Sequence, residues 1–289
     1  MRWINCIAVG LLLAVAGCST QYSKSDVGVV DVMTFNIRNG KAKDGANDWE
    51  HRQQMVVDVI EEYRADVVGL QEAFDFQAEY IAQAMSQYGA YYAGRDNGVK
   101  AGESCAIFYR RDRYELADSG TFWFSDTPSK PSTHWGNWHL RICSWVRLVD
   151  KADGKGIYVY NLHLDHRSQN SREKSTQLLA KKISQRKAKD PYIVMGDFNM
   201  AMDNSGMKYL VKDGVDTPYP RLFSAWHTIH PEDNLKTGHA FKGGTSGKAI
   251  DHILVEEKTI VLKANIDQRP IDGKYPSDHY PVTSTIKLY

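Results

Sequence analysis

The sequence predicts an α/β fold in which a pair of mixed β-sheets is covered by outer helices. The chain has 289 residues, of which 42% are hydrophobic and 25% charged, as is typical of a globular protein with a full core. Two early strand-like runs are each followed by a helical pattern, whereas the middle of the chain holds consecutive strand-like runs. Packed layers bury the apolar faces of such elements. No repeat or linker interrupts residues 29–289, so we expect one domain there.

The first 17 residues predict a secretory signal peptide that is not part of this domain. Arg2 precedes an apolar run, Ile7–Ala16, which is too short to span a bilayer. Val15-Ala16-Gly17-Cys18 resembles the bacterial lipobox, in which cleavage precedes the cysteine and the thiol is acylated. We therefore expect an exported lipoprotein of the bacterial cell envelope, on the outer membrane or cell surface, anchored through Cys18. Residues 18–28 would be the lipidated cysteine and a polar tether, and an ordinary cleaved signal is the alternative.

The first half of the domain alternates strands with helices and then becomes rich in strands. The alternating β-branched run Val29–Phe35 predicts a strand. Apolar residues at helical spacing predict a helix over Asp48–Tyr63, with Asn47 or Asp48 as the N-cap. A short apolar strand, Asp66–Leu70, and a second helix, Phe74–Tyr88, follow. The next four strands are predicted at Ser104–Tyr109, Ser119–Phe124, Ile142–Val149 and Gly156–Leu164.

The second half predicts two further helices and four strands. Asn170 and Glu173 fit a capping signal at the start of a helix that carries Leu178, Leu179 and Ile183. A buried strand and a short helix follow, and three strands close the chain. Their ranges are Pro191–Met195, Ser205–Val211, Ile250–Val255, Thr259–Ile266 and Val282–Leu288.

The charge of the chain weighs against a long nucleic acid as its main partner. There are 36 Lys and Arg against 35 Asp and Glu, and removing Arg2 with the signal leaves 35 against 35. Proteins that track a duplex usually carry a basic excess. The basic run between Lys181 and Lys189 lies on a predicted helix whose spacing spreads the charges, so a solvated helix face is favoured over a nucleic-acid surface.

Two cysteines remain in the domain once the N-terminal pair is accounted for. Cys6 leaves with the signal and Cys18 would carry lipid, whereas Cys105 and Cys143 each lie in a strand-like run. In an oxidising compartment they would be able to form a disulfide across neighbouring strands. Two buried thiols that pack as small apolar residues are the alternative, and both remain open.

Polar residues interrupt the predicted strands at their ends. Asn36 and Arg38 follow the first strand, and Gln71 and Glu72 follow the second. In open α/β sheets, the ends of strands form the crevice that binds ligands. Further polar groups of this kind are Asn161-Leu162-His163-Leu164-Asp165, Gly196-Asp197-Phe198-Asn199, Asp251-His252 and Ser277-Asp278-His279.

Convergence of Glu72, Asp197, Asp251 and Asp278 would require a compensating charge. Two carboxylates ~4 Å apart repel by about 4 kcal/mol at an effective dielectric constant of 20. Such a group either protonates or binds a cation, and oxygen ligands suit Mg²⁺ or Mn²⁺. A hard cation beside amides and histidines suits phosphate chemistry. Each motif alone also has a structural explanation, as a turn or a cap, so the ordered set carries the argument.

This ordered set resembles the endonuclease/exonuclease/phosphatase superfamily across residues 29–289. The resemblance implies a four-layer α/β/β/α sandwich of two mixed β-sheets with outer helices. It also implies metal-dependent hydrolysis of a phosphate ester, with Asn36, Glu72 and Asp278 as metal ligands and Glu72 as the principal one. Members of the superfamily include nucleases, sphingomyelinases, inositol polyphosphate phosphatases and nocturnin-like phosphatases.

The same resemblance implies five catalytic residues. Asp197 would orient or activate the attacking water, and Asn199 would position this water and the phosphate. His279 would face the scissile phosphate, with Asp251 fixing its ring. His163 would bind a phosphate oxygen or assist the leaving group.

Three further residues are candidates for contacts with substrate. Arg38 and Arg141 would each be able to bind a phosphate, and each is equally explained as a solvated surface residue. Trp135 belongs to the aromatic stretch Phe122–Trp145, which would either form a wall of the substrate site or pack a loop onto the sheet.

We therefore predict a divalent-metal-dependent phosphoesterase that uses Mg²⁺ or Mn²⁺. It would hydrolyse a small, glycan-linked or lipid-linked phosphodiester or phosphomonoester by attack of water on phosphorus. A secreted DNase or RNase is the first alternative and would need a basic groove. A non-catalytic surface lipoprotein that binds a ligand is the second, and would lack Glu72, Asp197 or His279. We expect a monomer that is held on the membrane by its N-terminal lipid, and nucleic acid is not the favoured partner.

Overall fold

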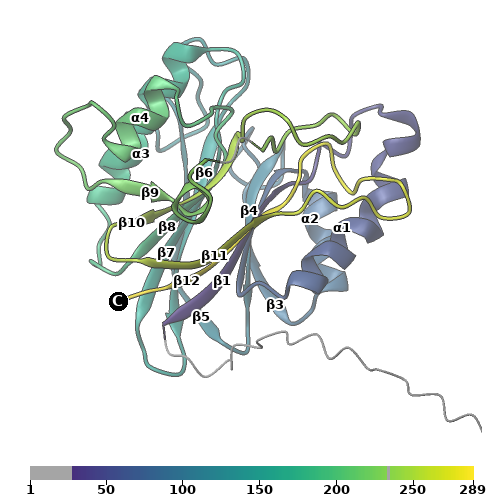
Figure 1. Cartoon of the computed structure of the whole chain (residues 1–289), viewed down its shortest axis with the longest axis horizontal. Coiled ribbons are helices and arrows are strands. Elements are labelled where there is room, and N and C mark those ends of the chain that lie inside the picture. Colours follow the sequence, from purple (N-terminus) through teal and green to yellow (C-terminus); the bar gives the residue numbers. More distant parts are fainter. Residues whose placement is uncertain (1–27, 233–234) are drawn as a thin grey trace, which may run out of the picture.

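A computed structural model describes residues 28–232 and 235–289 of the chain (Figure 1). The predicted signal peptide, residues 1–17, together with Cys18 and the tether up to residue 27, lies outside the described residues. Within the described ranges, no helix combines the length and the apolar character that crossing a membrane requires.

Two six-stranded mixed sheets form the centre of the molecule. The first has the order β11-β12-β1-β2-β4-β3 and the second β5-β6-β7-β8-β10-β9. The strands of the first sheet are β1 (Val29–Asn36), β2 (Val67–Ala73), β3 (Tyr88–Tyr91), β4 (Ser104–Arg110), β11 (Ile260–Ile266) and β12 (Val282–Lys287). Those of the second are β5 (Tyr114–Trp123), β6 (Ile142–Asp150), β7 (Gly156–His163), β8 (Tyr192–Asp197), β9 (Leu222–Ser224) and β10 (Asp251–Glu256).

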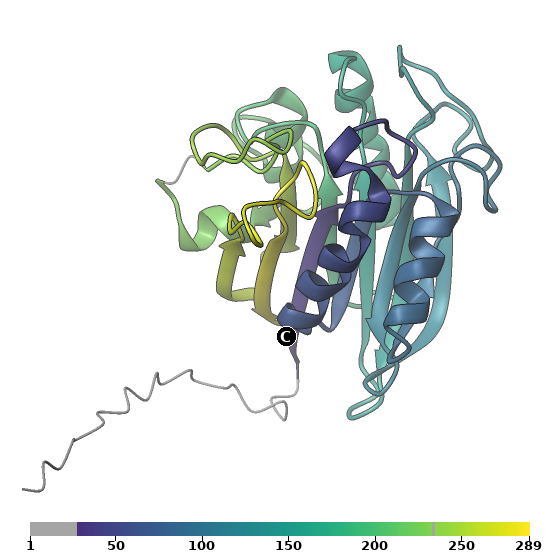
Figure 2. The ribbon, with the colours of Figure 1, turned by 90° about the vertical axis from the view of Figure 1, so that its right-hand side faces the viewer.

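Helices cover the outer faces of both sheets, so the predicted four-layer sandwich is confirmed (Figures 1 and 2). The inner faces meet in a core where Val32 of the first sheet and Val159 of the second are both buried. On the first sheet, Ile60 packs in one cluster with Phe35, and on the second, Leu179 packs in another with buried strand residues. The helices are η1 (Gly45–Asn47), α1 (Trp49–Tyr63), α2 (Asp75–Ala84), α3 (Gln169–Ser184), α4 (Ser205–Val211) and α5 (Ala225–Ile229).

The direction of the strands brings the predicted polar groups to one edge. β1 runs parallel to β2, and β7 runs parallel to β8, with His163 opposite Asp197. β10 is antiparallel to β8, so its first residue, Asp251, also lies opposite Asp197. β12 is antiparallel to β1, which places the segment just before β12, with His279, near the carboxyl end of β1.

Two buried amides join the sheets to each other. Asn161 of β7 is fully buried, and its Nδ2 donates hydrogen bonds to the carbonyl oxygens of Leu70 (2.9 Å) and Ala106 (2.8 Å) in the first sheet. Its Oδ1 accepts a hydrogen bond of 2.6 Å from Gln71 Nε2. Gly69 leaves room for this amide, because a Cβ at that position would lie 2.9 Å from Asn161 Cγ.

The capping prediction for α3 was wrong. The N-cap is Ser168, whose hydroxyl oxygen accepts a hydrogen bond of 3.1 Å from the Ser171 backbone N–H. Asn170 and Glu173 lie inside the helix instead, where Asn170 Nδ2 donates to the Trp135 carbonyl oxygen at 3.1 Å. For α1, Asp48 is the N-cap but makes no capping hydrogen bond with its side chain.

The second helix ends four residues earlier than predicted, and its last predicted residue, Tyr88, begins a strand. α2 ends at Ala84, and Tyr88–Tyr91 instead pairs antiparallel with β4 as β3. The short elements β9 and α5 were not predicted either.

The two domain cysteines are buried free thiols, and burial raises the pKa of both Cys105 and Cys143. The alternative of buried thiols therefore holds, and no disulfide joins these two residues.

Candidate active site

Asn36, at the end of β1, connects carboxylates from the two sheets. Its side chain is fully buried, and Nδ2 donates one hydrogen bond to Glu72 Oε1 and another to Asp197 Oδ2, both 3.1 Å long. Its Oδ1 accepts a hydrogen bond from the Arg38 backbone N–H at 3.0 Å. The structure thus brings three of the predicted site residues together and gives Asn36 the role of holding the two carboxylates in place.

Glu72 occupies a backbone conformation that is uncommon for its residue type. Its φ angle is 61°, and it lies where the pairing of β2 with β4 shifts register between Leu70 and Ala73. Oε2 accepts a hydrogen bond of 2.8 Å from the Asn39 backbone N–H, which our sequence analysis did not identify. Strained conformations of this kind cluster at functional sites, because surrounding contacts must maintain them.

Asp197, Asp251 and His279 form a compact group on the side of the second sheet. Each offers an atom within 4.8 Å of the other two, and Asp251 Oδ2 lies 2.8 Å from His279 Nδ1. Burial opposes protonation of His279, but Asp251, Asp197 and Asp278 outweigh it and raise the pKa of His279 well above its usual value. Burial and then Asp251 raise the pKa of Asp197 to about 7, although His279 opposes the shift.

His163 lies on the other side of Asp197 and has the opposite protonation preference. Its Nε2 is 3.5 Å from Asp197 Oδ2. Burial, followed by the charges of Arg141 and Arg95, lowers the pKa of His163 well below its usual value. The site therefore pairs one imidazolium, His279, with one neutral imidazole, so the two rings offer different proton-transfer chemistry.

Asn199 is fixed beside Asp197 by two hydrogen bonds. Its backbone N–H donates to Asp197 Oδ1 at 2.8 Å, and its Nδ2 donates to the Leu164 carbonyl oxygen at 3.0 Å. The φ angle of Asn199 is 50°, a left-handed conformation that asparagine tolerates better than most residues. The side chain stays half-buried at the edge of the sheet, where a ligand would reach it.

Asp278 completes the site from the segment before β12. Arg38 Nη1 lies 3.7 Å from Asp278 Oδ2, while the guanidinium also forms two hydrogen bonds of 2.9 Å to Asp44. Ser277 Oγ donates to the Asn36 carbonyl oxygen at 2.6 Å and so ties this segment to β1. Burial raises the pKa of Asp278, with Glu72 adding to the shift and His279 opposing it.

The chemistry of the donor set fits a hard divalent cation. Glu72, Asp197, Asp251 and Asp278 supply carboxylate oxygens, which Mg²⁺ and Mn²⁺ prefer. Asp251 Oδ1 is buried without a hydrogen-bond partner among the residues that the structure describes. Burial and the neighbouring charge of Asp251 also raise the pKa of Asp197. A cation bound beside these carboxylates would offset both effects.

A loop before β10 approaches the catalytic histidine, which our sequence analysis did not predict. Gly238 forms an isolated antiparallel bridge with His279, and a Cβ at Gly238 would lie 3.6 Å from His279 Cε1. The backbone N–H of His239 donates to the Asp278 carbonyl oxygen at 2.7 Å. The imidazole of His239 stacks on the ring of Tyr280, with ring centroids 3.9 Å apart. The glycine-rich stretch Gly243-Gly244-Thr245-Ser246-Gly247, which follows His239, is the feature of the sequence that indicates a loop here.

Arg141 is not a solvated surface residue. It is 3% exposed, with Nη2 2.9 Å from His166 Nδ1 and Nε 3.6 Å from Asp165 Oδ2. Its Nε has no hydrogen-bond partner among the described residues. Because its charge lowers the pKa of His163, Arg141 lies close enough to influence the site.

The contacts of Trp135 support the alternative in which this residue packs a loop onto the sheet. Its Nε1 donates to Asp126 Oδ1 at 2.9 Å, and the ring packs against the cluster beneath α3. Its carbonyl oxygen accepts a hydrogen bond of 2.9 Å from Ser168 Oγ. None of these contacts involves the residues that meet around Asp197.

Comparisons with known proteins agree with this geometry. A mannosyl-6-phosphatase of Bacteroides thetaiotaomicron is 28% identical and superposes with a TM-score of 0.82, covering 90% of this chain and 100% of its own. An uncharacterized protein of Acanthamoeba polyphaga mimivirus is 27% identical over 254 residues, which are 81% of this chain and 90% of that protein.

More distant similarity extends to nocturnin. Mouse nocturnin is 24% identical over 301 residues, covering 91% of this chain but only 64% of nocturnin. The human nocturnin catalytic domain with a bound sulfate anion has the same fold, with a TM-score of 0.72, 20% identity and coverage of 91% of this chain and 95% of that domain. The model of the Endonuclease/Exonuclease/phosphatase family matches residues 33–279, which include the whole site described above. The chain therefore belongs to the endonuclease/exonuclease/phosphatase family, whose members are hydrolases of phosphate esters.

Proposed function

We propose that this chain is a divalent-metal-dependent phosphoesterase that hydrolyses a glycan-linked or other small phosphate ester by attack of water on phosphorus. One observation carries the proposal: Asn36 holds Glu72 of the first sheet and Asp197 of the second, and Asp197 is grouped with Asp251 and His279. Carboxylates from both sheets thus surround a single edge that also presents amide and imidazole groups. This combination suits the transfer of a phosphoryl group to water.

The metal would be held by Glu72 and Asp278, with Asn36 keeping Glu72 in place. A bound Mg²⁺ or Mn²⁺ supplies Lewis acidity that polarises the phosphoryl oxygen. Asp197 accepts a hydrogen bond from the attacking water and orients it towards phosphorus. Asn199 uses its half-buried amide to position this water and the phosphate.

The two histidines would act on opposite sides of the phosphate. His279, which Asp251 holds as an imidazolium, donates a hydrogen bond to a phosphoryl oxygen where negative charge develops. His163 is neutral, and therefore either binds a second phosphoryl oxygen or assists the leaving group. Arg141 would stabilise substrate charge beyond His163.

Two observations support a phosphorylated sugar as the substrate class. The similar mannosyl-6-phosphatase shares 28% of its residues over almost the full chain. The charge of the domain is balanced, whereas binding along a nucleic acid usually requires a basic excess.

The test is hydrolysis of a substrate panel by the full chain, purified in detergent. The panel holds mannose 6-phosphate, p-nitrophenyl phosphate, bis(p-nitrophenyl) phosphate, a phospholipid and single-stranded DNA, each with Mg²⁺, with Mn²⁺ and with a chelator. Glu72→Gln is compared with Glu79→Gln, which makes the same change at a half-buried glutamate of α2 that pairs with Lys100 at 2.7 Å. We expect turnover of mannose 6-phosphate that the chelator and Glu72→Gln abolish and Glu79→Gln leaves intact.

Other outcomes would change the proposal in defined ways. Preference for DNA would favour the secreted nuclease, and preference for the phospholipid would favour a lipid-linked substrate. Absence of turnover from folded protein with either metal would favour the ligand-binding lipoprotein. Turnover that resists the chelator would contradict the role of the metal.

We also propose that Cys18 is lipidated and anchors the exported chain to a membrane of the cell envelope. The lipobox sequence Val15-Ala16-Gly17-Cys18 supports this proposal. Cys18→Ser should move the chain from the membrane to the soluble fraction and abolish labelling by a fatty-acid probe. An unchanged distribution would contradict the anchor. The monomeric state stays a prediction, which sedimentation of the detergent-free Cys18→Ser chain would test.

A further inference from the structure

A groove on the outer face of the second sheet shares no residue with the catalytic site. This outer groove has a volume of about 440 Å³ and lies between β5, β6 and β7 on one side and the end of α3 with the residues after it on the other. The residues that matter most are Phe122, Trp145 and Tyr160 on the sheet, and Lys182, Arg186 and Lys187 on the helical side. Its volume falls within the range of about 300–1,000 Å³ that is usual for sites that bind small ligands.

Aromatic rings form the floor of the outer groove. Trp145 and Tyr158 have ring centroids 5.9 Å apart, and Tyr158 and Tyr160 are stacked at 6.2 Å. Gly120 pairs with Trp145 in the register of β5 and β6, and a Cβ there would lie 2.9 Å from the indole. The indole therefore lies across the neighbouring strand, where it stays half-buried and bounds the groove.

Two polar groups on this floor lack partners within the protein. The indole Nε1 of Trp145 and the hydroxyl of Tyr160 have no hydrogen-bond partner in the part of the chain that the structure describes. Aromatic residues whose polar ends are free are suited to ligands that combine an apolar face with hydroxyl groups. A pyranose ring is such a ligand, because its C–H face stacks on an aromatic ring while its hydroxyls bond to donors and acceptors around it.

Positive charge exceeds negative charge in the outer groove. Three cations, Lys182, Arg186 and Lys187, line it with a single carboxylate, Asp118, which pairs with Lys187 at 3.0 Å. Lys182 Nζ lies 5.7 Å from the centroid of the Phe122 ring and has no carboxylate partner among the described residues. The Arg186 guanidinium donates to the carbonyl oxygens of Ile183 and Asp190 and has no carboxylate partner among the described residues.

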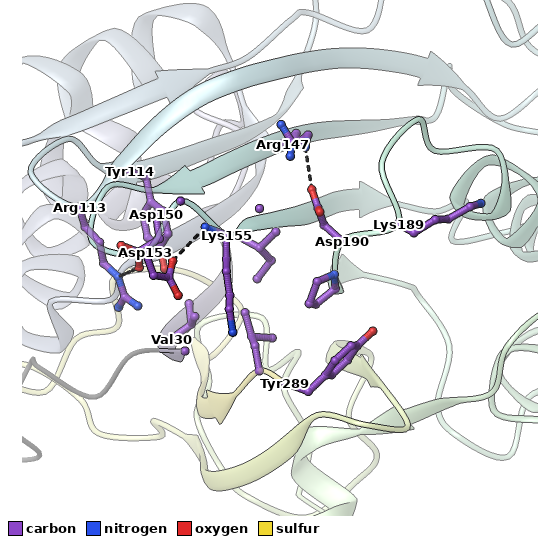
Figure 3. A pocket seen from close by; sticks show the side chains of 16 residues that line it. Val30, Arg113, Tyr114, Arg147, Asp150, Asp153, Lys155, Lys189, Asp190 and Tyr289 are labelled. Carbon is purple, nitrogen blue, oxygen red and sulfur yellow. Dashed lines mark hydrogen bonds and ion pairs between the residues drawn. The ribbon is translucent and has the colours of Figure 1, made fainter.

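A smaller cavity at another place in the molecule shows the contrast. This cavity, of about 280 Å³, is lined by four basic and three acidic side chains, and two of the basic ones, Arg113 and Arg147, pair with carboxylates that line it (Figure 3). Arg147 Nε lies 2.7 Å from Asp190 Oδ2, and Arg113 Nε lies 2.9 Å from Asp150 Oδ2. Both arginines of this cavity are paired within the protein, whereas Lys182 and Arg186 of the outer groove have no carboxylate partner among the described residues.

We propose that the outer groove binds an acidic oligosaccharide. The aromatic floor receives the C–H faces of the sugar rings, and Trp145 Nε1 and the Tyr160 hydroxyl bond to their hydroxyl groups. Lys182 and Arg186 bind the carboxylate or sulfate substituents through charge-assisted hydrogen bonds. The short groove and its small excess of charge are poorly suited to a nucleic acid, whose binding relies on many phosphate contacts.

The same groove accounts for two features that the catalytic site leaves unused. Part of the basic run between Lys181 and Lys189 lines the outer groove, whereas Lys181 is exposed on α3 and does not line it. Phe122 and Trp145, from the two ends of the aromatic stretch, lie together in the groove. Lys182 thus lines the groove from the same helix on which Lys181 is exposed.

The test is calorimetric titration of the full chain, in detergent, with defined hexasaccharides. Chondroitin sulfate and polygalacturonate hexasaccharides are the acidic probes, and maltohexaose is the neutral one. Lys182→Glu is compared with Lys181→Glu, which makes the same change of charge at the next residue. We expect at least one acidic probe to bind, at least tenfold weaker binding after Lys182→Glu, and unchanged binding after Lys181→Glu.

A second variant and an activity measurement make the result decisive. Trp145→Phe keeps an apolar ring but removes the indole N–H, and should weaken binding several-fold with unchanged near-ultraviolet circular dichroism. Lys182→Gln replaces Lys182→Glu if the latter fails to fold. Hydrolysis of p-nitrophenyl phosphate should be the same in the wild type and in Lys182→Glu, whichever substrate the catalytic site uses.

Three results would overturn the proposal. The first is absence of binding by both acidic probes at millimolar concentration. The second is equal loss of binding in Lys181→Glu and Lys182→Glu, which would indicate unspecific attraction between charges. The third is equally tight binding of a single-stranded DNA oligonucleotide, which would indicate a general polyanion surface.

Discussion

Asn161→Ala is expected to destabilise the protein by about 3–5 kcal/mol. Asn161 makes three hydrogen bonds across the interface of the sheets, to Leu70, Ala106 and Gln71, and its side chain is fully buried. Each hydrogen bond contributes roughly 1 kcal/mol net, and each buried partner left unsatisfied costs about 1–3 kcal/mol. Gln71 Nε2 keeps a second acceptor, Thr34 Oγ1 at 2.9 Å. Removing its bond to Asn161 should therefore cost a free energy at the low end of this range.

Urea unfolding followed by circular dichroism measures the change. With an m-value of about 3 kcal/mol/M, the midpoint should fall by roughly 1–1.7 M. Asn265→Ala is the matched control, because Asn265 is exposed and makes one hydrogen bond, of 3.0 Å, to Tyr63; its effect should stay within about 0.5 kcal/mol. A loss below about 1 kcal/mol for Asn161→Ala would refute the view that this amide joins the sheets.

Three further predictions concern the site, a glycine and the thiols. His279→Ala should lower kcat/KM for p-nitrophenyl phosphate by on the order of 10²-fold with an unchanged circular dichroism spectrum, because a donor to the phosphate is lost; a loss below about threefold would contradict its role. Gly196→Ala should lower the urea midpoint by an amount equivalent to more than about 2 kcal/mol. The φ angle of Gly196 is 143°, and a new Cβ would lie only 2.1 Å from the Leu162 carbonyl oxygen. An unchanged midpoint would show that the backbone moves to accommodate the methyl group. Cys105 and Cys143 should resist Ellman's reagent in the native state, and a reductant should leave Tm unchanged, because both are buried free thiols; a fall in Tm on reduction would reveal a disulfide.

The strands that frame the site were predictable because their apolar pattern is strong and polar residues end them. The expected helix Ser205–Val211 has the same bounds as α4, and the expected strand Val29–Phe35 is one residue shorter than β1. The start of β5 was placed five residues late, because Glu115 and Asp118 interrupt the apolar pattern of an edge strand that pairs on one side only. The four residues of β3 are a strand only because β4 pairs with them, which no local pattern records.

The residues of the site were predictable as a group, but their individual contacts were not. Gln71 and Asn161 belong to the same motifs as Glu72 and His163, yet they bond to each other across the sheets. Alternation along a strand tells which face a side chain occupies, whereas its partner on the other sheet depends on how the sheets are placed. The left-handed conformation of Glu72 likewise results from a shift in strand register, to which its residue type gives no clue.

β1 separates the start of the domain from its catalytic edge. The strand begins at Val29, directly after the predicted tether, and ends at Asn36, which contacts the carboxylates of the site. Eight residues of strand span about 26 Å. A chain held at Cys18 would therefore enter the domain at one end of this strand and form the catalytic edge at the other end. Because the attachment point and the catalytic edge would lie at opposite ends of β1, such an anchor would leave the entrance for the substrate unobstructed.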